Sequence, residues 1–374
     1  MTTQKKTLII DARMIEHAGI GTYLQNLIPL IMDHFNVSLL AASENLTKYD
    51  WSSRLRVLNT FSPIYSVSEQ LELPRKIFRV DGFWSPHFNI PVLPVRARKR
   101  IVTIHDVFHL VFYDQLPLVQ KLYAKQMFRQ IVRRADRIIT VSNTSRDEIC
   151  RYTTAHREDI SVIYNGIDTG LFKIKTDKSS AKQIQKKYGL PDRFILFVGS
   201  VKPHKNLKRL LFAFQKLHRR FDDIGLVVVG KYEGLVTADK EIAELIRNDP
   251  ALQNKVHFTS VVPMEELPFI YGLAYAFAFP STYEGFGLPP LEAMACGCPT
   301  IVSNIPIMRE ICQDAAYYVD PLNADDIAGG LRRVLEDQAL RQKLKSTGLR
   351  RVTHFSWKES AEKHISVIDK LLAN

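Results

Sequence analysis

The sequence predicts an α/β protein of two domains, each built on a parallel sheet covered by helices. Its 374 residues exceed the ~250–300 at which a single core usually stops growing. Short apolar strands alternate with helical patterns in both halves, which is typical of βαβ units. The composition, 46% hydrophobic and 24% charged, indicates a globular chain and excludes a disordered or membrane-spanning one.

The first domain is predicted to begin with a buried strand at Thr7–Asp11, followed by a glycine turn and a helix at Thr22–Phe35. The polar segment Lys173–Ser180 is interpreted as the linker to the second domain. Short apolar runs predict the remaining strands of this half at Val37–Ala41, Arg100–Ile104, Arg137–Val141 and Ile160–Ile163.

The alternation restarts with a strand at Phe194–Gly199 and a helix at Asn206–Arg219, and the chain is helical from Ala324 onward. Ligands of such sheets bind at the carboxyl ends of the strands, so the residues after each strand are the candidates for function. Further strands are predicted at Gly225–Gly230, Lys255–Thr259, Ala274–Phe279 and Pro299–Ser303.

The formal net charge of +12 is concentrated in the first 180 residues, which hold 25 basic and 17 acidic side chains. Such a field attracts phosphates, nucleic acid or an anionic lipid surface. The apolar run Leu8–Ile10 is shorter than the ~7–15 residues of a signal peptide, so a cytoplasmic protein is expected. Cys296 and Cys298 lack zinc-knuckle spacing, and the four cysteines are expected to be small buried thiols.

Two loops of the first domain carry candidate groups. Gly19 and Gly21 open a helix after the first strand, where bare backbone suits a phosphate or a sugar hydroxyl, although a plain helix cap is the alternative. His105 follows another strand, and a buried structural histidine is its alternative role. A metal site with Asp106 and His109 is disfavoured, because no second ligand cluster supports it.

The second domain carries the more specific pattern. Lys205 lies at a helix start after a strand, as a diphosphate ligand would, although a solvated loop lysine is the alternative. The segment Pro280–Ala293 then combines two glycines, two prolines in a first helical turn, and Glu284 and Glu292. Acidic capping alone does not explain this order, so we expect a helix N-terminus that holds an anion between two carboxylates.

This segment resembles the signature of the retaining glycosyltransferases called family 4, or group 1, in which seven residues separate two glutamates. Other segments resemble the family's motifs in the same order, and together they cover nearly the whole chain: Gly19–Tyr23, His105–Asp106, Val141–Ser142, Asn165–Asp168, Gly199–Asn206 and Phe355–Trp357.

The resemblance implies a GT-B fold of two Rossmann-like domains whose parallel sheets face each other across a cleft. Residues 1–172 would bind the acceptor and residues 181–355 the nucleotide-sugar donor. The final segment, 356–374, would be a helix that crosses back to the first domain.

The resemblance also implies roles for individual residues. Lys205 would bind the donor diphosphate, Glu292 its ribose, and Glu284 the transferred sugar, which His105 would also contact. Ser200 stands where many members have arginine, and Lys202 is the candidate to supply that charge. The remaining donor contacts would come from Gly21 at the diphosphate, Val261 and Val262 at the base, and the backbone of Phe286, Gly287 and Leu288 at the sugar.

The expected reaction is retaining transfer of a hexose to a glycan or lipid-linked acceptor in polysaccharide synthesis, with the departing phosphate taking the acceptor's proton. General resemblance to bacterial mannosyltransferases points to GDP-mannose, and UDP-glucose or a similar donor is the alternative. No metal ion or other cofactor is expected. A nucleotide-sugar epimerase or hydrolase is a further enzymatic alternative. A nucleic-acid-binding module is disfavoured, because no recognised binding motif is present.

A predicted helix at Pro117–Arg137 offers a use for the basic first half. Four basic side chains recur on it every four residues and form one stripe: Lys121, Lys125, Arg129 and Arg133. Such a face suits anionic lipid head groups, so peripheral binding to the inner face of the cell membrane is one expectation. An ordinary solvated helix face is the alternative.

Overall fold

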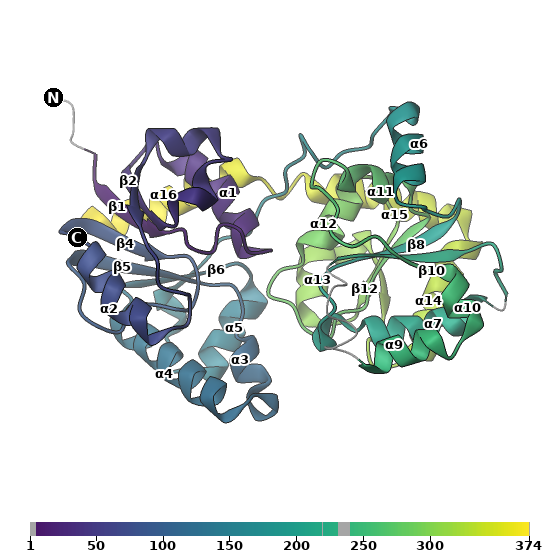
Figure 1. The fold of residues 1–374 in the computed structure, drawn as a ribbon, viewed down its shortest axis with the longest axis horizontal. Helices are drawn as coiled ribbons and strands as arrows, with labels where there is room; N and C mark the ends of the chain where they lie inside the picture. Colours follow the sequence, from purple (N-terminus) through teal and green to yellow (C-terminus); the bar gives the residue numbers. More distant parts are fainter. Residues whose placement is uncertain (1–4, 219, 231–239, 374) are drawn as a thin grey trace. The chain divides into compact units, whose positions relative to one another are not determined.

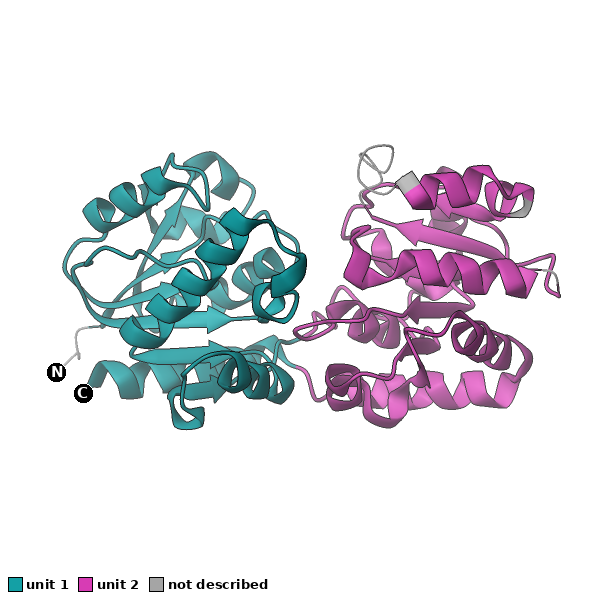
Figure 2. Cartoon of the chain, turned by 90° about the horizontal axis from the view of Figure 1, so that it is seen from below, with its two compact units in different colours: residues 1–166, 356–374 teal, residues 167–355 magenta. Residues whose placement is uncertain are grey.

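The computed structural model describes residues 5–218, 220–230 and 240–373 (Figure 1). The chain divides into two compact units (Figure 2), of which unit 1 comprises residues 1–166 and 356–374 and unit 2 comprises residues 167–355. The sequence placed the domain limits at 172 and 181 instead. The predicted helix end at Arg219 lies outside the described residues.

Unit 1 is built on a seven-stranded sheet in the order β3-β2-β1-β4-β5-β6-β7, and every pair of neighbours is parallel. The strands are β1 (Thr7–Asp11), β2 (Asn36–Ala41), β3 (Arg56–Asn59), β4 (Val80–Ser85), β5 (Ala97–Ile104), β6 (Arg137–Thr140) and β7 (Ile160–Val162). The helices are α1 (Ile20–Ile31), α2 (Val67–Lys76), α3 (Phe108–Val111), α4 (Leu118–Arg134), α5 (Asn143–Tyr152) and α16 (Trp357–Ala373).

Unit 2 has a six-stranded sheet in the order β10-β9-β8-β11-β12-β13, again parallel throughout. The strands are β8 (Phe194–Val198), β9 (Gly225–Val229), β10 (Val256–Phe258), β11 (Ala276–Phe279), β12 (Thr300–Ser303) and β13 (Tyr317–Val319). The helices are α6 (Lys178–Lys187), α7 (Leu207–His218), α9 (Lys240–Arg247), α10 (Pro250–Lys255), α11 (Leu267–Leu273), α12 (Leu288–Ala295), α13 (Pro306–Cys312), α14 (Ala324–Glu336) and α15 (Gln338–Val352).

The C-terminal helix α16 completes unit 1, where it contacts α1. The Nδ1–H of buried His364 donates to the Ser360 carbonyl, so its Nε2 accepts the Tyr23 hydroxyl at 2.6 Å. Burial lowers the pKa of His364 to about 4, which keeps the ring neutral at pH 7. The end of the chain therefore supplies part of the first unit's core.

The linker prediction is wrong at its end, because Lys178–Ser180 already belong to α6. The carboxylate of Asp177 caps this helix by accepting the backbone N–H groups of Ser179 at 2.9 Å and Ser180 at 3.2 Å. Because the residues that follow this capping aspartate are polar, the start of the helix lacks the apolar pattern by which we predict helices from sequence.

Both sheets have a point at which the strand order reverses. It lies between β1 and β4 in unit 1 and between β8 and β11 in unit 2. Ligands of open α/β sheets bind beyond the carboxyl ends of the strands at such a point. The loops that follow these four strands are therefore the places to look for function.

Within the described residues, no helix is both long and apolar enough to cross a membrane. The cysteines are free thiols, of which Cys296, Cys298 and Cys312 are buried, as expected, and Cys150 is half-buried.

Candidate active site

The loops that follow β8 and β11 are tied together at the reversal point of unit 2. Asn206 is buried in a left-handed conformation with φ +63°, and its Nδ2 donates to the carbonyls of Pro280 at 2.9 Å and Pro321 at 2.6 Å. The backbone N–H of Thr282 donates to the His204 carbonyl at 2.8 Å. These bonds fix the loop that carries Lys205 against the loop that carries Glu284.

Lys205 and Glu284 form a close ion pair within these loops. The Nζ of Lys205 lies 2.7 Å from Oε1 and 2.9 Å from Oε2 of Glu284. Their side chains are 19% and 11% exposed, so both charges are largely withdrawn from water yet still reachable. The ammonium also lies 5.4 Å from the centre of the Phe279 ring. The sequence predicted both residues as ligands, and the structure brings them into direct contact.

Helix α12 begins directly after this pair. Its capping residue, Gly287, has φ +102°, a backbone conformation that strongly favours glycine. Pro289 and Pro290 occupy the first turn, where no backbone hydrogen bond is lost. Glycine adds no side-chain cap, and the positive end of the helix dipole favours an anion at this position.

Glu292 is buried in α12, and its Oε2 accepts the Tyr271 hydroxyl at 2.9 Å. Burial raises the pKa of the Glu292 carboxyl to about 7, while the hydrogen bond from Tyr271 opposes that shift. Burial and the neighbouring carboxylate raise the pKa of Tyr271 well above its usual range. The group predicted to bind ribose is thus about half ionised near neutral pH.

The other predicted donor residues of unit 2 lie in loops or at the start of α12. Ser200 and Lys202 are exposed after β8, and Val261 is exposed after β10, next to half-buried Val262. The side chain of Phe286 is buried, with its ring 5.8 Å from that of Phe355, and Leu288 is half-buried.

The two predicted residues of unit 1 both have local structural explanations. A Cβ on Gly21 would lie 2.5 Å from the Ile15 carbonyl oxygen, so packing alone requires glycine there. The Nε2–H of His105 donates to the Pro86 carbonyl at 2.9 Å, and burial lowers the pKa of the ring to about 4. His105 is therefore neutral near pH 7.

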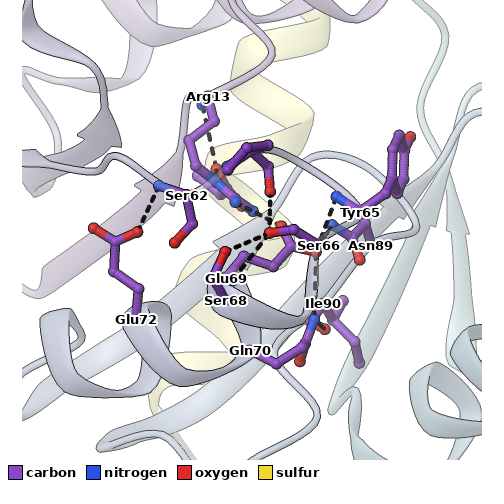
Figure 3. A network of polar contacts seen from close by, with 12 residues as sticks. Arg13, Ser62, Tyr65, Ser66, Ser68, Glu69, Gln70, Glu72, Asn89 and Ile90 are labelled. Atoms are coloured by element: carbon purple, nitrogen blue, oxygen red, sulfur yellow. Dashed lines mark hydrogen bonds and ion pairs between the residues drawn. The ribbon is translucent and has the colours of Figure 1, made fainter.

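A buried polar network that sequence reasoning missed lies at the reversal point of unit 1 (Figure 3). The Arg13 guanidinium donates to Asp11 at 2.8 and 2.7 Å and to Glu69 at 2.6 Å. His87 contacts the Asp11 carboxylate at 3.2 Å, and Asn89 donates to Glu69 at 2.7 Å. The available signal was Asp11, a charged residue at the end of a buried strand.

Within the part of the chain that the structure describes, no group of three or more His, Cys, Asp or Glu side chains is arranged to hold a metal ion. Asp106 accepts the backbone N–H of Phe108 at 2.9 Å.

Comparisons with known proteins agree with this architecture. Residues 18–171 match the family model described as "Glycosyltransferase Family 4", and residues 180–351 match "Glycosyl transferases group 1". The O-antigen chain mannosyltransferase RfbU of Salmonella typhimurium is 32% identical over 272 residues, which cover 72% of this chain and 69% of that one. The O-antigen chain mannosyltransferase B of Escherichia coli is 29% identical over 275 residues, covering 73% and 71%.

Among solved structures, Anabaena HepE in complex with UDP and glucose has a TM-score of 0.80 at 17% identity, covering 98% of this chain and all of that one. WaaG, a glycosyltransferase of lipopolysaccharide biosynthesis, has a TM-score of 0.75 at 13% identity and covers 97% and 99%. These likenesses show the GT-B fold. With two matching family models and a relative at 32% identity, the chain belongs to the group 1, or family 4, glycosyltransferases.

Proposed function

We propose that the protein transfers mannose from GDP-mannose, with retention of configuration, to a glycan or lipid-linked glycan acceptor. The observation that carries the proposal is the Lys205–Glu284 pair at the start of α12, beside the reversal point of the unit 2 sheet. The sugar is proposed from the relatives, since both curated proteins named above are O-antigen chain mannosyltransferases.

The chemistry follows from where charge develops. Breaking the anomeric C–O bond builds positive charge on the sugar and negative charge on the departing diphosphate. We assign the stabilisation of that negative charge to the Lys205 ammonium and the positive end of α12, a role that a metal ion has in other transferases. The proposed reaction is therefore metal-independent.

The ion pair itself explains how the donor is accepted. An ammonium has three N–H donors, and Lys205 directs two short contacts to the Glu284 oxygens. One lysine thus bridges the carboxylate and a phosphate oxygen, while the other lone pairs of Glu284 take sugar hydroxyls. The ribose is assigned to Glu292, the base to Val261 and Val262, and the sugar also to the backbone of Phe286, Gly287 and Leu288.

Proton transfer is assigned to the departing phosphate. His105 is uncharged near pH 7 because its pKa is about 4, so it has no proton to give as an imidazolium. We assign it a contact with the transferred sugar, Gly21 an approach to the diphosphate, and Ser200 with Lys202 the remaining diphosphate contact.

The outer face of α4 is proposed to rest on an anionic membrane surface. Lys125, Arg129 and Arg133 are exposed there, whereas Lys121 is half-buried and donates to the Asp114 carbonyl at 3.1 Å. Three apolar side chains at the start of the same helix are 70%, 79% and 59% exposed: Leu118, Val119 and Leu122. Exposed apolar residues followed by a basic stripe suit a lipid interface.

The first test removes the charges of the site one at a time. Lys205→Ala and Glu284→Gln are each expected to lower transfer about 100-fold or more, as loss of one electrostatic donor does in other enzymes. Lys208→Ala is the matched control, because Lys208 pairs with Glu241 on the surface of the same unit. Transfer within a few-fold of wild type in the Lys205 variant would refute its role.

The donor, stereochemistry and metal assignments are tested separately. Calorimetric titration is expected to give tighter binding of GDP than of UDP, and equal or tighter UDP binding would overturn the mannose donor. NMR of the product is expected to show an α-mannoside, and a β-mannoside would overturn retention. Activity is expected to survive EDTA dialysis, and a loss restored by Mg²⁺ or Mn²⁺ would overturn metal independence.

A further inference from the structure

Unit 1 has its own reversal point, and the residues there form a connected polar network. Asp11 ends β1 and His87 follows β4, the two strands between which the order reverses. The backbone N–H of Asn89 donates to Nδ1 of His87 at 3.2 Å, so the imidazole proton is on Nε2 and points to the Asp11 carboxylate. The network thus spans the position at which open α/β sheets hold ligands.

The charges of this network are almost completely buried. Asp11, Arg13 and Glu69 have side chains that are at most 4% exposed. Burial opposes the charge on Asp11, but Arg13 and His87 hold the pKa of its carboxyl well below its usual range. Apolar residues of similar volume usually stabilise a core at least as well as such ion pairs do. The network therefore calls for a purpose other than stability, and its outer ends indicate one.

The network ends on two tyrosines. Oε1 of Glu69 accepts the backbone N–H of Tyr65 at 3.1 Å, and the Oδ1 of Asn89 accepts the Tyr123 hydroxyl. Tyr65 has φ +67°, a left-handed conformation that bulky side chains avoid. The buried ion pair between Glu69 and Arg13 thus holds a strained backbone in place, and such strain is concentrated at functional sites.

Tyr65 gains little burial in return for this strain, since 47% of it is exposed. Its ring stacks on Phe88, with centres 5.9 Å apart and planes at 27°, and Phe88 stacks in turn on Phe128 at 5.4 Å and 1°. The Tyr123 ring stands perpendicular to Tyr65 at 5.9 Å. In Figure 3 the Tyr65 ring points away from the hydrogen-bonded network. The result is a rigid aromatic surface backed by the core.

The loop positions place this surface at the ligand-binding edge of the sheet. Tyr65 lies in the loop that leaves β3, and Phe88 in the loop that leaves β4. Asp106, whose charge acts on Tyr65, follows β5. An aromatic face near the half-buried side chains of Asp106 and Tyr123 suits one ligand class in particular. A pyranose ring presents C–H bonds on one face and hydroxyls around its rim.

We propose that Tyr65, supported by Phe88 and held by Glu69, is the platform on which the terminal pyranose of the acceptor stacks. This inference rests on the proposed glycosyl transfer for the identity of its ligand, an acceptor glycan. It assigns acceptor recognition to the Arg13–Glu69 network of unit 1, acting through Tyr65, and gives the strained conformation of Tyr65 a purpose.

The experiment uses the full chain without any nucleotide, so its result does not depend on the donor assignment. Saturation-transfer NMR measures Kd for methyl α-mannoside, methyl α-glucoside, methyl β-galactoside and methyl N-acetyl-α-glucosaminide. At least one of them is expected to bind wild type through the protons of one ring face. If none binds, the platform is overturned, even where GDP binds normally.

The key variant is Tyr65→Asn, because asparagine accepts the left-handed conformation without a ring. It is expected to raise the Kd of the bound glycoside at least tenfold and to leave the melting temperature unchanged or higher. Tyr65→Phe keeps the ring and is expected to stay within about twofold. Tyr152→Ala, at a tyrosine that is 41% exposed at the end of α5, is the matched control.

Three further results, beside the absence of any glycoside binding, would overturn the proposal. The first is a Kd for Tyr65→Asn within twofold of wild type, and the second is an equal loss in Tyr152→Ala. The third is a saturation-transfer signal from 1-octanol, a sugar-free apolar probe, that wild type gives and Tyr65→Asn does not. That result would assign the surface to a lipid chain. GDP binding by Tyr65→Asn is expected to match wild type, which separates this proposal from the donor site.

Discussion

Replacing Glu292 with glutamine is expected to change the pH dependence of unit 2 stability. The pKa of Glu292 rises from 4.5 to about 7 on folding because its carboxyl is buried. Between these two values the folded protein holds a proton that the unfolded chain has released. The free energy of unfolding of wild type therefore falls as pH rises through this window.

The size of the effect follows from the shift. Each pKa unit corresponds to about 1.4 kcal/mol, so the raised pKa of Glu292 costs the folded state about 3 kcal/mol at pH 8 but only about 1 kcal/mol at pH 5, where the folded protein keeps the proton. Glutamine never ionises, and its carbonyl still accepts the hydrogen bond that Tyr271 donates. The free energy of unfolding of Glu292→Gln minus that of wild type is thus expected to be about 2 kcal/mol larger at pH 8 than at pH 5.

Urea unfolding monitored by circular dichroism at both pH values measures this gain. The three tryptophans of the chain, Trp51, Trp84 and Trp357, all lie in unit 1, so tryptophan fluorescence gives an internal control that the variant should not alter. Glu265→Gln, at an exposed glutamate of unit 2, controls for the loss of a charge. A stability difference between Glu292→Gln and wild type that is equal at pH 5 and pH 8 would refute the reasoning.

Three further outcomes are expected. A triple variant of α4 should bind phosphatidylglycerol vesicles about 100-fold more weakly than wild type, at ~1 kcal/mol per charge: Lys125→Gln, Arg129→Gln and Arg133→Gln. Phosphatidylcholine vesicles are the control, and wild type that sediments equally with both kinds of vesicle would contradict the prediction. Gly166→Ala should destabilise unit 1 by about 2 kcal/mol or more in tryptophan-monitored unfolding, because its Cβ would lie 2.1 Å from the Trp357 nitrogen. Gly272→Ala, where a Cβ meets no atom within 4 Å, should be nearly neutral, and equal losses in both would count against the clash. The His105 ring should titrate near pH 4 by NMR, because burial lowers its pKa; a midpoint near 6.5 would show a hydrated ring.

The sequence was most informative where buried strands are continuous apolar runs. β1 has the predicted bounds, and β8 and β9 lie within one residue of theirs. The strand β4 escaped prediction because Asp81 and Gly82 interrupt its apolar pattern. A Cβ on Gly82 would lie 3.0 Å from the Leu8 side chain, so packing against β1 favours glycine there. The edge strand β3 was also missed, because it is only partly buried and its sequence is not a continuous apolar run.

The candidate site was predictable only as far as its residues are close in sequence. Glu284 and Glu292 lie on one loop and helix, so their spacing indicated an anion-binding helix start. The pairing of Glu284 with Lys205 and the bond from Tyr271 to Glu292 join residues 79 and 21 positions apart. Likewise, the contact between Arg13 and Glu69 spans 56 positions, and no local pattern predicts it.

The return of α16 to unit 1 has a consequence for how the protein is made. A ribosome releases the chain from its N-terminus, so the first 166 residues of unit 1 emerge first yet lack α16 until unit 2 has been translated. Unit 2 is one continuous stretch, residues 167–355, and is able to close earlier. A frameshift between residues 356 and 373 would therefore damage the half of the molecule that was synthesised first, although the altered codons follow all of unit 2.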